Sequence, residues 1–124
     1  MSTKPRISIV DDDQFVRNAL SRLCASVGYE VSVYGSAEEF IESETAQPSD
    51  FLVLDVHLPG RSGLELQSDL QGVNRALPIV FVTAYDDDEA RMQAIAGGAI
   101  DYLRKPLDSD RLLHLIENAL KAEK

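Results

Sequence analysis

The sequence predicts a single α/β domain built on a five-stranded parallel sheet. Five short apolar runs, β-branched or rich in aromatic residues, alternate with amphipathic helical segments along the whole chain. The runs cover residues 7–10, 31–34, 51–54, 79–82 and, more weakly, 102–103. Apolar runs this short are typical of strands buried on both faces, which implies a parallel sheet with helices on each side. Right-handed crossovers between successive βα units fit the strand order 2-1-3-4-5.

Helical patterns fill the segments between these runs and complete a (βα)5 repeat. They cover residues 14–27, 37–43, 63–70, a segment that starts after acidic residues 86–88 and ends at residues 97–98, and residues 109–121. Gly28 is placed to cap the first helix, and Ser36 followed by Glu39 is a capping-box pattern for the second. The acidic residues before the fourth helix lie at the positive end of its dipole.

Length and composition indicate one globular domain over residues 1–124. Apolar residues make up 44% of the chain and charged residues 27%, close to an ordinary soluble domain. Cys24, the only cysteine, lies in an apolar helical pattern, so we expect a buried structural thiol and a reducing environment. The first residues contain no signal-peptide core, and no apolar run approaches the roughly 18 residues of a membrane span. We therefore expect a cytoplasmic protein without membrane contact.

The net charge of −9 bears on the possible partners. A surface this acidic repels nucleic acid and anionic membranes. We therefore expect contact with DNA only through a separate module outside these residues.

Polar side chains follow four of the five apolar runs. They are Asp11, Asp12 and Asp13 after the first run, Asp55 after the third, Thr83 after the fourth and Lys105 after the fifth. In an open parallel sheet, the functional site lies outside the carboxyl ends of the strands, where the strand order reverses. We therefore expect these side chains to meet at one edge of the sheet.

The residue types at this edge suit phosphoryl transfer. Carboxylates of Asp11, Asp12 and Asp55 would repel one another unless a cation intervenes, and Mg²⁺ prefers such oxygen ligands. Lys105 and Thr83 add a positive charge and a hydroxyl for phosphoryl oxygens. An ionised Asp55 is already a nucleophile, so phosphoryl transfer needs mainly positioning and charge neutralisation.

A structural explanation exists for each of these residues taken alone. Acidic residues after a strand often cap the following helix, and we expect Asp13 to do so. A lone Asp, Thr or Lys at a strand end has little diagnostic value. The combination of all of them at successive strand ends favours the phosphoryl site.

Four segments carry a family resemblance: IVDDD at residues 9–13, LDVHLPG at 54–60 with Gly63, VTA at 82–84, and GAIDYLRKP at 98–106. With these segments in this order, the chain resembles the receiver (CheY-like) domain of bacterial two-component response regulators over essentially its whole length. The resemblance implies a flavodoxin-like fold. Residues 36–40 and 98–102 most resemble the FixJ-like subclass, whose receivers precede a LuxR-type DNA-binding domain.

The resemblance implies a role for each acidic residue of the site. Asp55 would be the phosphoacceptor. Asp12 would bind Mg²⁺ directly and Asp11 largely through water, with Asp55 also a ligand. The backbone carbonyl of His57 would complete the protein ligands.

The resemblance also implies a switch. Thr83 and Lys105 would bind the phosphoryl oxygens, and Tyr102 would turn inward when Thr83 moves. The Lys105–Pro106 peptide bond would be cis, which proline permits. Such a domain catalyses its own phosphorylation and dephosphorylation without being a conventional turnover enzyme.

Further expectations from the resemblance concern partners. A sensor histidine kinase would donate the phosphoryl group. Residues 87–121 would form the signalling face and support a phosphorylation-dependent homodimer, with candidate polar contacts at Arg91, Asp101, Arg104 and Arg111. We expect this chain to be the N-terminal domain of a longer regulator with a transcriptional output, although a stand-alone regulator fits as well.

Three bulky residues lie close in sequence to the predicted site residues. His57 and Tyr85 are bulky at positions that, in the family, line the path of the water that hydrolyses the acyl phosphate. We hypothesise that they lengthen the lifetime of the phosphorylated state. Phe15 either covers the mouth of the site or packs under the first helix.

Three other functions would share parts of this chemistry. A pseudo-receiver that never takes phosphate is disfavoured because Asp11, Asp12, Asp55, Thr83 and Lys105 are all present. A haloacid-dehalogenase-like hydrolase is disfavoured because the chain lacks its Asp-x-Asp context and room for a cap. A receiver from a hybrid histidine kinase has the same local chemistry and stays open.

Overall fold

The computed structural model of the chain describes residues 4–44, 48–72, 77–85 and 87–122. Residues 1–3 of the N-terminal segment and Asp86, part of the acidic run before the fourth helix, lie outside the described residues. The strands are β1 (Arg6–Val10), β2 (Glu30–Tyr34), β3 (Phe51–Asp55), β4 (Ile79–Thr83) and β5 (Asp101–Arg104). The helices are α1 (Gln14–Ser26), α2 (Ala37–Glu44), α3 (Gly63–Gly72), α4 (Asp88–Ala96) and α5 (Ser109–Ala122).

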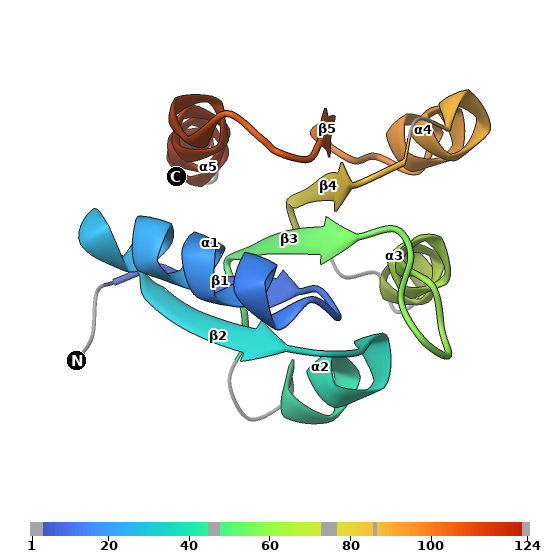
Figure 1. The fold of residues 1–124 in the computed structure, drawn as a ribbon, viewed down its shortest axis with the longest axis horizontal. Coiled ribbons are helices and arrows are strands. Elements are labelled where there is room, and N and C mark those ends of the chain that lie inside the picture. The colour runs from blue at the N-terminus through green and yellow to red at the C-terminus, as the bar shows by residue number, and fades with distance from the viewer. Residues whose placement is uncertain (1–3, 45–47, 73–76, 86, 123–124) are drawn as a thin grey trace.

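All five strands are parallel and lie in the order β2-β1-β3-β4-β5, which confirms the predicted topology (Figure 1). The order reverses at β1, because β1 pairs with both β2 and β3. The loops after β1 and β3 therefore leave the sheet side by side. These are the loops that carry Asp12 and His57.

Helices cover both faces of the sheet and enclose two apolar cores. One face packs against α1 and α5 through Leu20, Cys24, Leu112 and Ile116. The other packs against α2, α3 and α4, with Phe40, Leu66 and Ala94 among its buried side chains. Burial of apolar surface on both faces is the main driving force for this three-layer arrangement.

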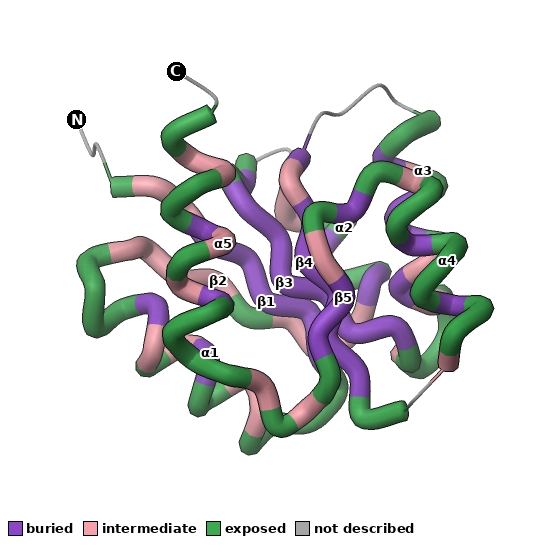
Figure 2. The backbone as a smooth tube through the Cα atoms, turned by 90° about the horizontal axis from the view of Figure 1, so that it is seen from above, coloured by how far each residue is buried: buried purple, intermediate pink, exposed green. Residues whose placement is uncertain are grey.

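The strands differ in burial, which corrects one expectation. Every residue of β3 and β4 is buried, as predicted for strands covered on both faces (Figure 2). In β2 no residue is fully buried, and Val33 is exposed. The reason is position, because β2 pairs with β1 on one side and is the edge strand of the sheet on the other.

The helix ends follow the predicted caps. Asp13 caps α1 by accepting a hydrogen bond from the Phe15 amide, and Gly28 after the helix has φ +96°. That left-handed conformation is open to glycine without a steric penalty. Ser36 accepts from the Glu39 amide at 3.2 Å at the start of α2.

Cys24 is fully buried, as the helical pattern predicts. Burial raises the pKa of its thiol to about 11, so the group is protonated and unreactive at neutral pH. None of the helices in the described part of the chain has the length and apolar character that crossing a bilayer requires.

Candidate functional site

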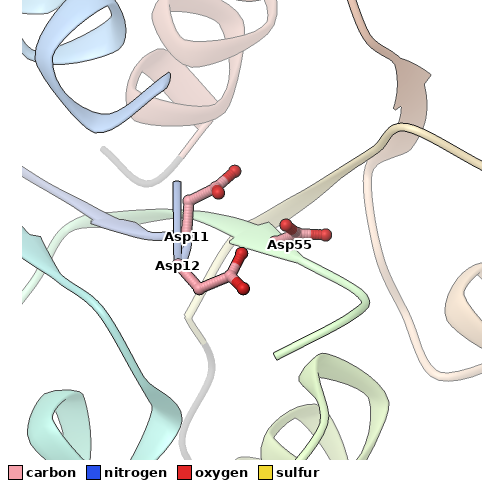
Figure 3. Close-up of side chains that lie close together, drawn as sticks. All are labelled: Asp11, Asp12 and Asp55. Atoms are coloured by element: carbon pink, nitrogen blue, oxygen red, sulfur yellow. The ribbon is translucent and has the colours of Figure 1, made fainter. Parts of the chain in front are cut away.

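Three carboxylates meet at the carboxyl edge of the sheet, as the strand order predicts. Asp11 and Asp12 follow β1, and Asp55 ends β3 (Figure 3). One oxygen from each of the three lies within 4.8 Å of the others. Asp11 is fully buried and Asp55 nearly so, whereas Asp12 is exposed to solvent. Two buried carboxylates and one accessible carboxylate thus face a common point.

Lys105 supplies the positive charge of this site. Its Nζ lies 2.7 Å from Oδ2 of Asp11 and 3.2 Å from Oδ2 of Asp55. The Lys105 amide donates to the Thr83 carbonyl at 2.8 Å, which fixes the segment after β5 against the end of β4. The Lys105–Pro106 peptide bond is cis, as expected. The sequence prediction that these strand ends converge is therefore met for Asp11, Asp55 and Lys105.

The electrostatics of Asp55 are a balance of opposing effects. Burial and the neighbouring Asp11 carboxylate raise the pKa of Asp55, and the His57 amide and Lys105 act against them. The His57 amide donates to Asp55 Oδ1 at 3.1 Å. Burial lowers the pKa of Lys105, but its hydrogen bond to Asp11 and the charge of Asp55 outweigh this and raise it. Lys105 therefore stays protonated while the net pKa of Asp55 is raised.

Gly63 explains how the loop after β3 closes tightly over the site. Its amide donates to the Val56 carbonyl at 2.9 Å. A Cβ at this position would lie 2.2 Å from the Asp55 carbonyl oxygen, which is far closer than van der Waals contact. Any larger residue would push α3 away from the end of β3, so Gly63 holds the loop against Asp55.

Thr83 is fully buried at the end of β4, next to the strand that ends in Asp55. Its Oγ1 accepts a hydrogen bond from the Tyr85 amide at 3.2 Å. The side chains of Tyr85 and His57 are in contact, with ring centroids 4.7 Å apart and planes at 78°. The two bulky residues singled out in the sequence are thus in direct edge-to-face contact, although they leave different strands.

Tyr102 is buried and lies against Phe81, with ring centroids 6.4 Å apart. Its hydroxyl makes no hydrogen bond of ordinary geometry within the described residues, although it lies close enough to Thr83 for that residue to lower its pKa. Burial and the nearby Asp87 carboxylate raise the pKa of this phenol, so it is neutral at physiological pH. The ring is therefore already inward, and its buried hydroxyl lies near Thr83.

The donor set fits a hard divalent cation. Three carboxylates within reach of one point offer the oxygen ligands that Mg²⁺ takes, and one of them, Asp12, is open to solvent. Lys105 compensates only part of their charge. Asp11, Asp12 and Asp55 would hold the cation.

Two residues near the site have surroundings that the sequence did not reveal. Arg17 on α1 donates from Nη1 to the Asp11 carbonyl at 2.7 Å. Phe15 is 87% exposed, so it does not pack under the first helix. It lines a groove of about 520 Å³ between α1 and the segment after β5, together with Val16 and Leu107. A basic residue one turn into a helix that follows an acidic loop was the available signal for Arg17.

The predicted signalling face contains exposed apolar side chains. Met92 and Ile95 on α4 and Ile100 before β5 are 71%, 45% and 40% exposed. Asp101 and Arg111 form an ion pair between β5 and α5. Arg91 and Arg104 are exposed.

The family model of the response regulator receiver domain matches residues 7–117, which include every site residue described above. The chain belongs to this family. Receiver domains of two-component systems are phosphorylation-activated signalling switches, and the chain is of that class. This outcome favours the main interpretation over a dehalogenase-like hydrolase or a pseudo-receiver.

Individual relatives agree with the family. The chain is 40% identical over 99% of its length to nodulation protein W of Bradyrhizobium diazoefficiens, and 33% identical over 98% to the transcriptional regulatory protein FixJ of the same organism. It spans 54% and 59% of the length of these two relatives. A receiver domain protein (CheY-like) from Methanospirillum hungatei superimposes with a TM-score of 0.90 at 27% identity, covering 97% of this chain and 96% of that one.

Proposed function

We propose that Asp55 of this receiver domain accepts a phosphoryl group from a sensor histidine kinase in the presence of Mg²⁺. The observation that carries the proposal is the convergence of Asp11, Asp12, Asp55 and Lys105 at one point of the sheet edge. Placing three carboxylates and one lysine together at a largely buried site destabilises the folded protein unless these groups bind a ligand. In the reaction an Asp55 carboxylate oxygen bonds to phosphorus, and the bond from phosphorus to the donor nitrogen breaks.

A bound Mg²⁺ would neutralise charge on the phosphoryl oxygens during the transfer. The residues of the chain have the remaining tasks. Asp11, Asp12 and Asp55 would hold the cation, with the backbone carbonyl of His57 as a further ligand. Lys105 binds a phosphoryl oxygen, and its positive charge counteracts the effect of burial on the nucleophile.

The switch would begin at Thr83. Its hydroxyl now accepts from the Tyr85 amide and would turn to donate to a phosphoryl oxygen on Asp55. This movement would change the surroundings of the buried Tyr102 ring, whose hydroxyl lies near Thr83. Because Tyr102 lies on β5 and Asp87 caps α4, a change there would reach the face formed by α4, β5 and α5.

We propose that this face mediates a phosphorylation-dependent homodimer. The exposed side chains of Met92, Ile95 and Ile100 would form its apolar part, with Asp101 and Arg111 among the polar contacts. Light scattering of the phosphorylated domain should report a dimer, and Met92→Glu should keep it monomeric. A dimer that persists in Met92→Glu would contradict this choice of face.

The output is proposed from the relatives. FixJ and the similar protein TdiR of Thauera aromatica are transcriptional regulatory proteins, and the chain spans 59% and 50% of their lengths. We propose that this chain is the N-terminal domain of a cytoplasmic regulator of transcription. DNA would bind to a separate LuxR-type output domain, in keeping with the net charge of −9 here.

The proposal is tested by incubating the protein with acetyl phosphate, with and without Mg²⁺, and measuring the intact mass. We expect one added phosphoryl group in the presence of Mg²⁺ only, and none in Asp55→Asn. A folded wild-type protein that gains no mass would contradict the proposal and favour a non-phosphorylated interaction module.

A further inference from the structure

The Asp12 carboxylate depends on its backbone for its position. Asp12 is exposed, and within the described residues no hydrogen bond or ion pair holds its side chain. Asp11 differs, since its carboxylate binds Lys105 and the Asp13 amide. A short carboxylate without contacts of its own can be placed only through the main chain that carries it.

Arg17 fixes that main chain. Its Nη1 donates to the carbonyl oxygen of Asp11 at 2.7 Å. This carbonyl belongs to the peptide unit that joins Asp11 to Asp12, and the unit is planar. Fixing the oxygen therefore orients the whole plane, including the amide nitrogen from which Asp12 continues. On the N-terminal side, the Asp11 amide donates to the Tyr34 carbonyl at 3.1 Å. Hydrogen bonds therefore hold both the amide and the carbonyl of Asp11.

Arg17 is itself well placed for this task. Its amide donates to the Asp13 carbonyl at 3.0 Å in the first turn of α1, and its side chain is half-buried. A Cβ at Gly35 would lie 3.4 Å from Nη1 of Arg17, so the guanidinium group lies beside the loop after β2. The planar guanidinium is thus confined between the acidic loop and the loop after β2.

From this geometry we infer that Arg17 is a positioning residue for the divalent cation, acting through the Asp11–Asp12 peptide unit. The inference rests on the proposed function of the site. Residues that orient metal ligands commonly change metal affinity by about 10-fold or more when they are removed. Arg17 would act in this way on Asp12.

The direction of the change in divalent-cation affinity distinguishes a positioning role of Arg17 from a purely electrostatic one. Arg17 is a cation next to a cation site, so loss of its charge alone would tighten divalent binding. Loss of its hydrogen bond would release the peptide unit and weaken binding. The two effects are opposite, so one affinity measurement distinguishes them.

The test uses the whole chain without any phosphodonor and measures Mn²⁺ affinity from the electron paramagnetic resonance signal of the free ion. We expect Arg17→Met to weaken binding by about 10-fold. We expect Arg17→Lys to restore part of the affinity, because an ammonium group still donates. Arg22→Met is the matched control: it removes a positive charge from an exposed position of α1 and should leave the affinity unchanged.

Equal or tighter Mn²⁺ binding by Arg17→Met, with the fold verified by circular dichroism, would overturn the inference. If Arg17→Met does not fold, Arg17→Lys decides: severalfold weaker binding supports positioning, and unchanged binding contradicts it. A wild-type protein that binds no Mn²⁺ would overturn the proposed function, and this inference with it.

Discussion

Polar side chains near the amino ends of the strands differ from those at the carboxyl ends in how far their hydrogen bonds and charges are satisfied within the fold. Near the amino ends, the buried hydroxyls of Ser8 and Ser49 bond to each other, and Ser49 also bonds to Glu44 through its amide and its hydroxyl at 3.0 Å. At the carboxyl ends, three carboxylates lie close together, only Asp11 and Asp55 contact the single lysine, and the pKa of Asp55 is raised. The first group is internally satisfied, and the second has an excess of negative charge.

This difference distinguishes a structural polar cluster from a functional one. Buried polar groups that find donors and acceptors within the fold specify the packing of the chain and need nothing else. Buried groups left with unbalanced charge lower stability unless they serve a ligand or a reaction. The carboxyl edge of this sheet is of the second kind, which is why we assign the chemistry there.

Removal of Lys105 should have the largest effect. In Lys105→Met the buried carboxylate of Asp11 and that of Asp55 lose their shared counter-charge. We expect the free energy of unfolding to fall by about 3 kcal/mol at pH 7 in the presence of a chelator, measured by urea denaturation. Added Mg²⁺ should recover part of the loss.

The control for this substitution is Lys121→Met. Lys121 pairs with Glu117 at 3.4 Å, and both side chains are more than half exposed. Removing an exposed pair of this kind should change the free energy of unfolding by less than about 0.5 kcal/mol. Equal losses for the two lysine substitutions would mean that the carboxyl edge is not a site of unbalanced charge.

Disruption of the amino-end cluster should have a smaller effect, confined to stability. Ser49→Ala removes the hydroxyl that bonds to the buried Ser8 and to Glu44. We expect the free energy of unfolding to fall by roughly 1–2 kcal/mol. The rate of phosphorylation by acetyl phosphate should stay at the wild-type value. A slowed rate would show that the two ends of the sheet are not independent.

Neutralisation of Asp55 should act in the opposite direction. Because burial and Asp11 raise the folded-state pKa of Asp55, the folded protein holds this proton to a higher pH than the unfolded chain does. Stability contributed by Asp55 is therefore greatest in acid, and it is lost as pH rises from the unfolded pKa through the folded one. We expect Asp55→Asn to be more stable than wild type at pH 7 in a chelator, measured by thermal denaturation.

The advantage of Asp55→Asn should shrink as the pH falls from the raised folded-state pKa toward the unfolded pKa of an aspartate, about 3.9, and should change no further below it. Asp50→Asn is a suitable control, since Asp50 is exposed near the amino ends of the strands. An Asp55→Asn protein that is less stable than wild type at pH 7 would show that Lys105 outweighs burial and Asp11.

The smallest effect is expected from the aromatic contact beside the site. His57 and Tyr85 lie edge to face, and we expect the pair to hinder the water that hydrolyses the acyl phosphate. His57→Ala and Tyr85→Ala should each shorten the half-life of the phosphorylated protein by about threefold, which corresponds to roughly 0.7 kcal/mol in the barrier. Unchanged half-lives, measured by loss of the phosphorylated mass over time, would refute this role.

Much of the fold was predictable, because its determinants are local. Apolar runs such as residues 51–54 and 79–82 can be buried only in a covered sheet, and the strand order then follows from right-handed crossovers. The exposure of β2 was not predicted, because a run of apolar residues does not show whether its strand lies at an edge. That property depends on which strands pair, not on the residues of β2.

The site, like the fold, has some contacts that the sequence predicted and others that it did not. Asp11, Asp55 and Lys105 were predicted to meet because each stands at the end of a strand in a known order. The bond from Arg17 to the Asp11 carbonyl was not predicted, since the direction of a backbone oxygen depends on the torsion angles of a loop. The contact between His57 and Tyr85 was also missed, because it depends on how two loops fold back after their strands.

The central claim is that one of three neighbouring carboxylates, Asp55, takes the phosphoryl group while Asp11 and Asp12 hold the cation. Borohydride reduction converts a phosphorylated aspartate to homoserine, and peptide mapping by mass spectrometry then locates it. After treatment with acetyl phosphate and Mg²⁺, we predict homoserine at residue 55 and aspartate at residues 11 and 12. Homoserine at residue 11 or 12, or at none of the three in a folded protein, would contradict the account.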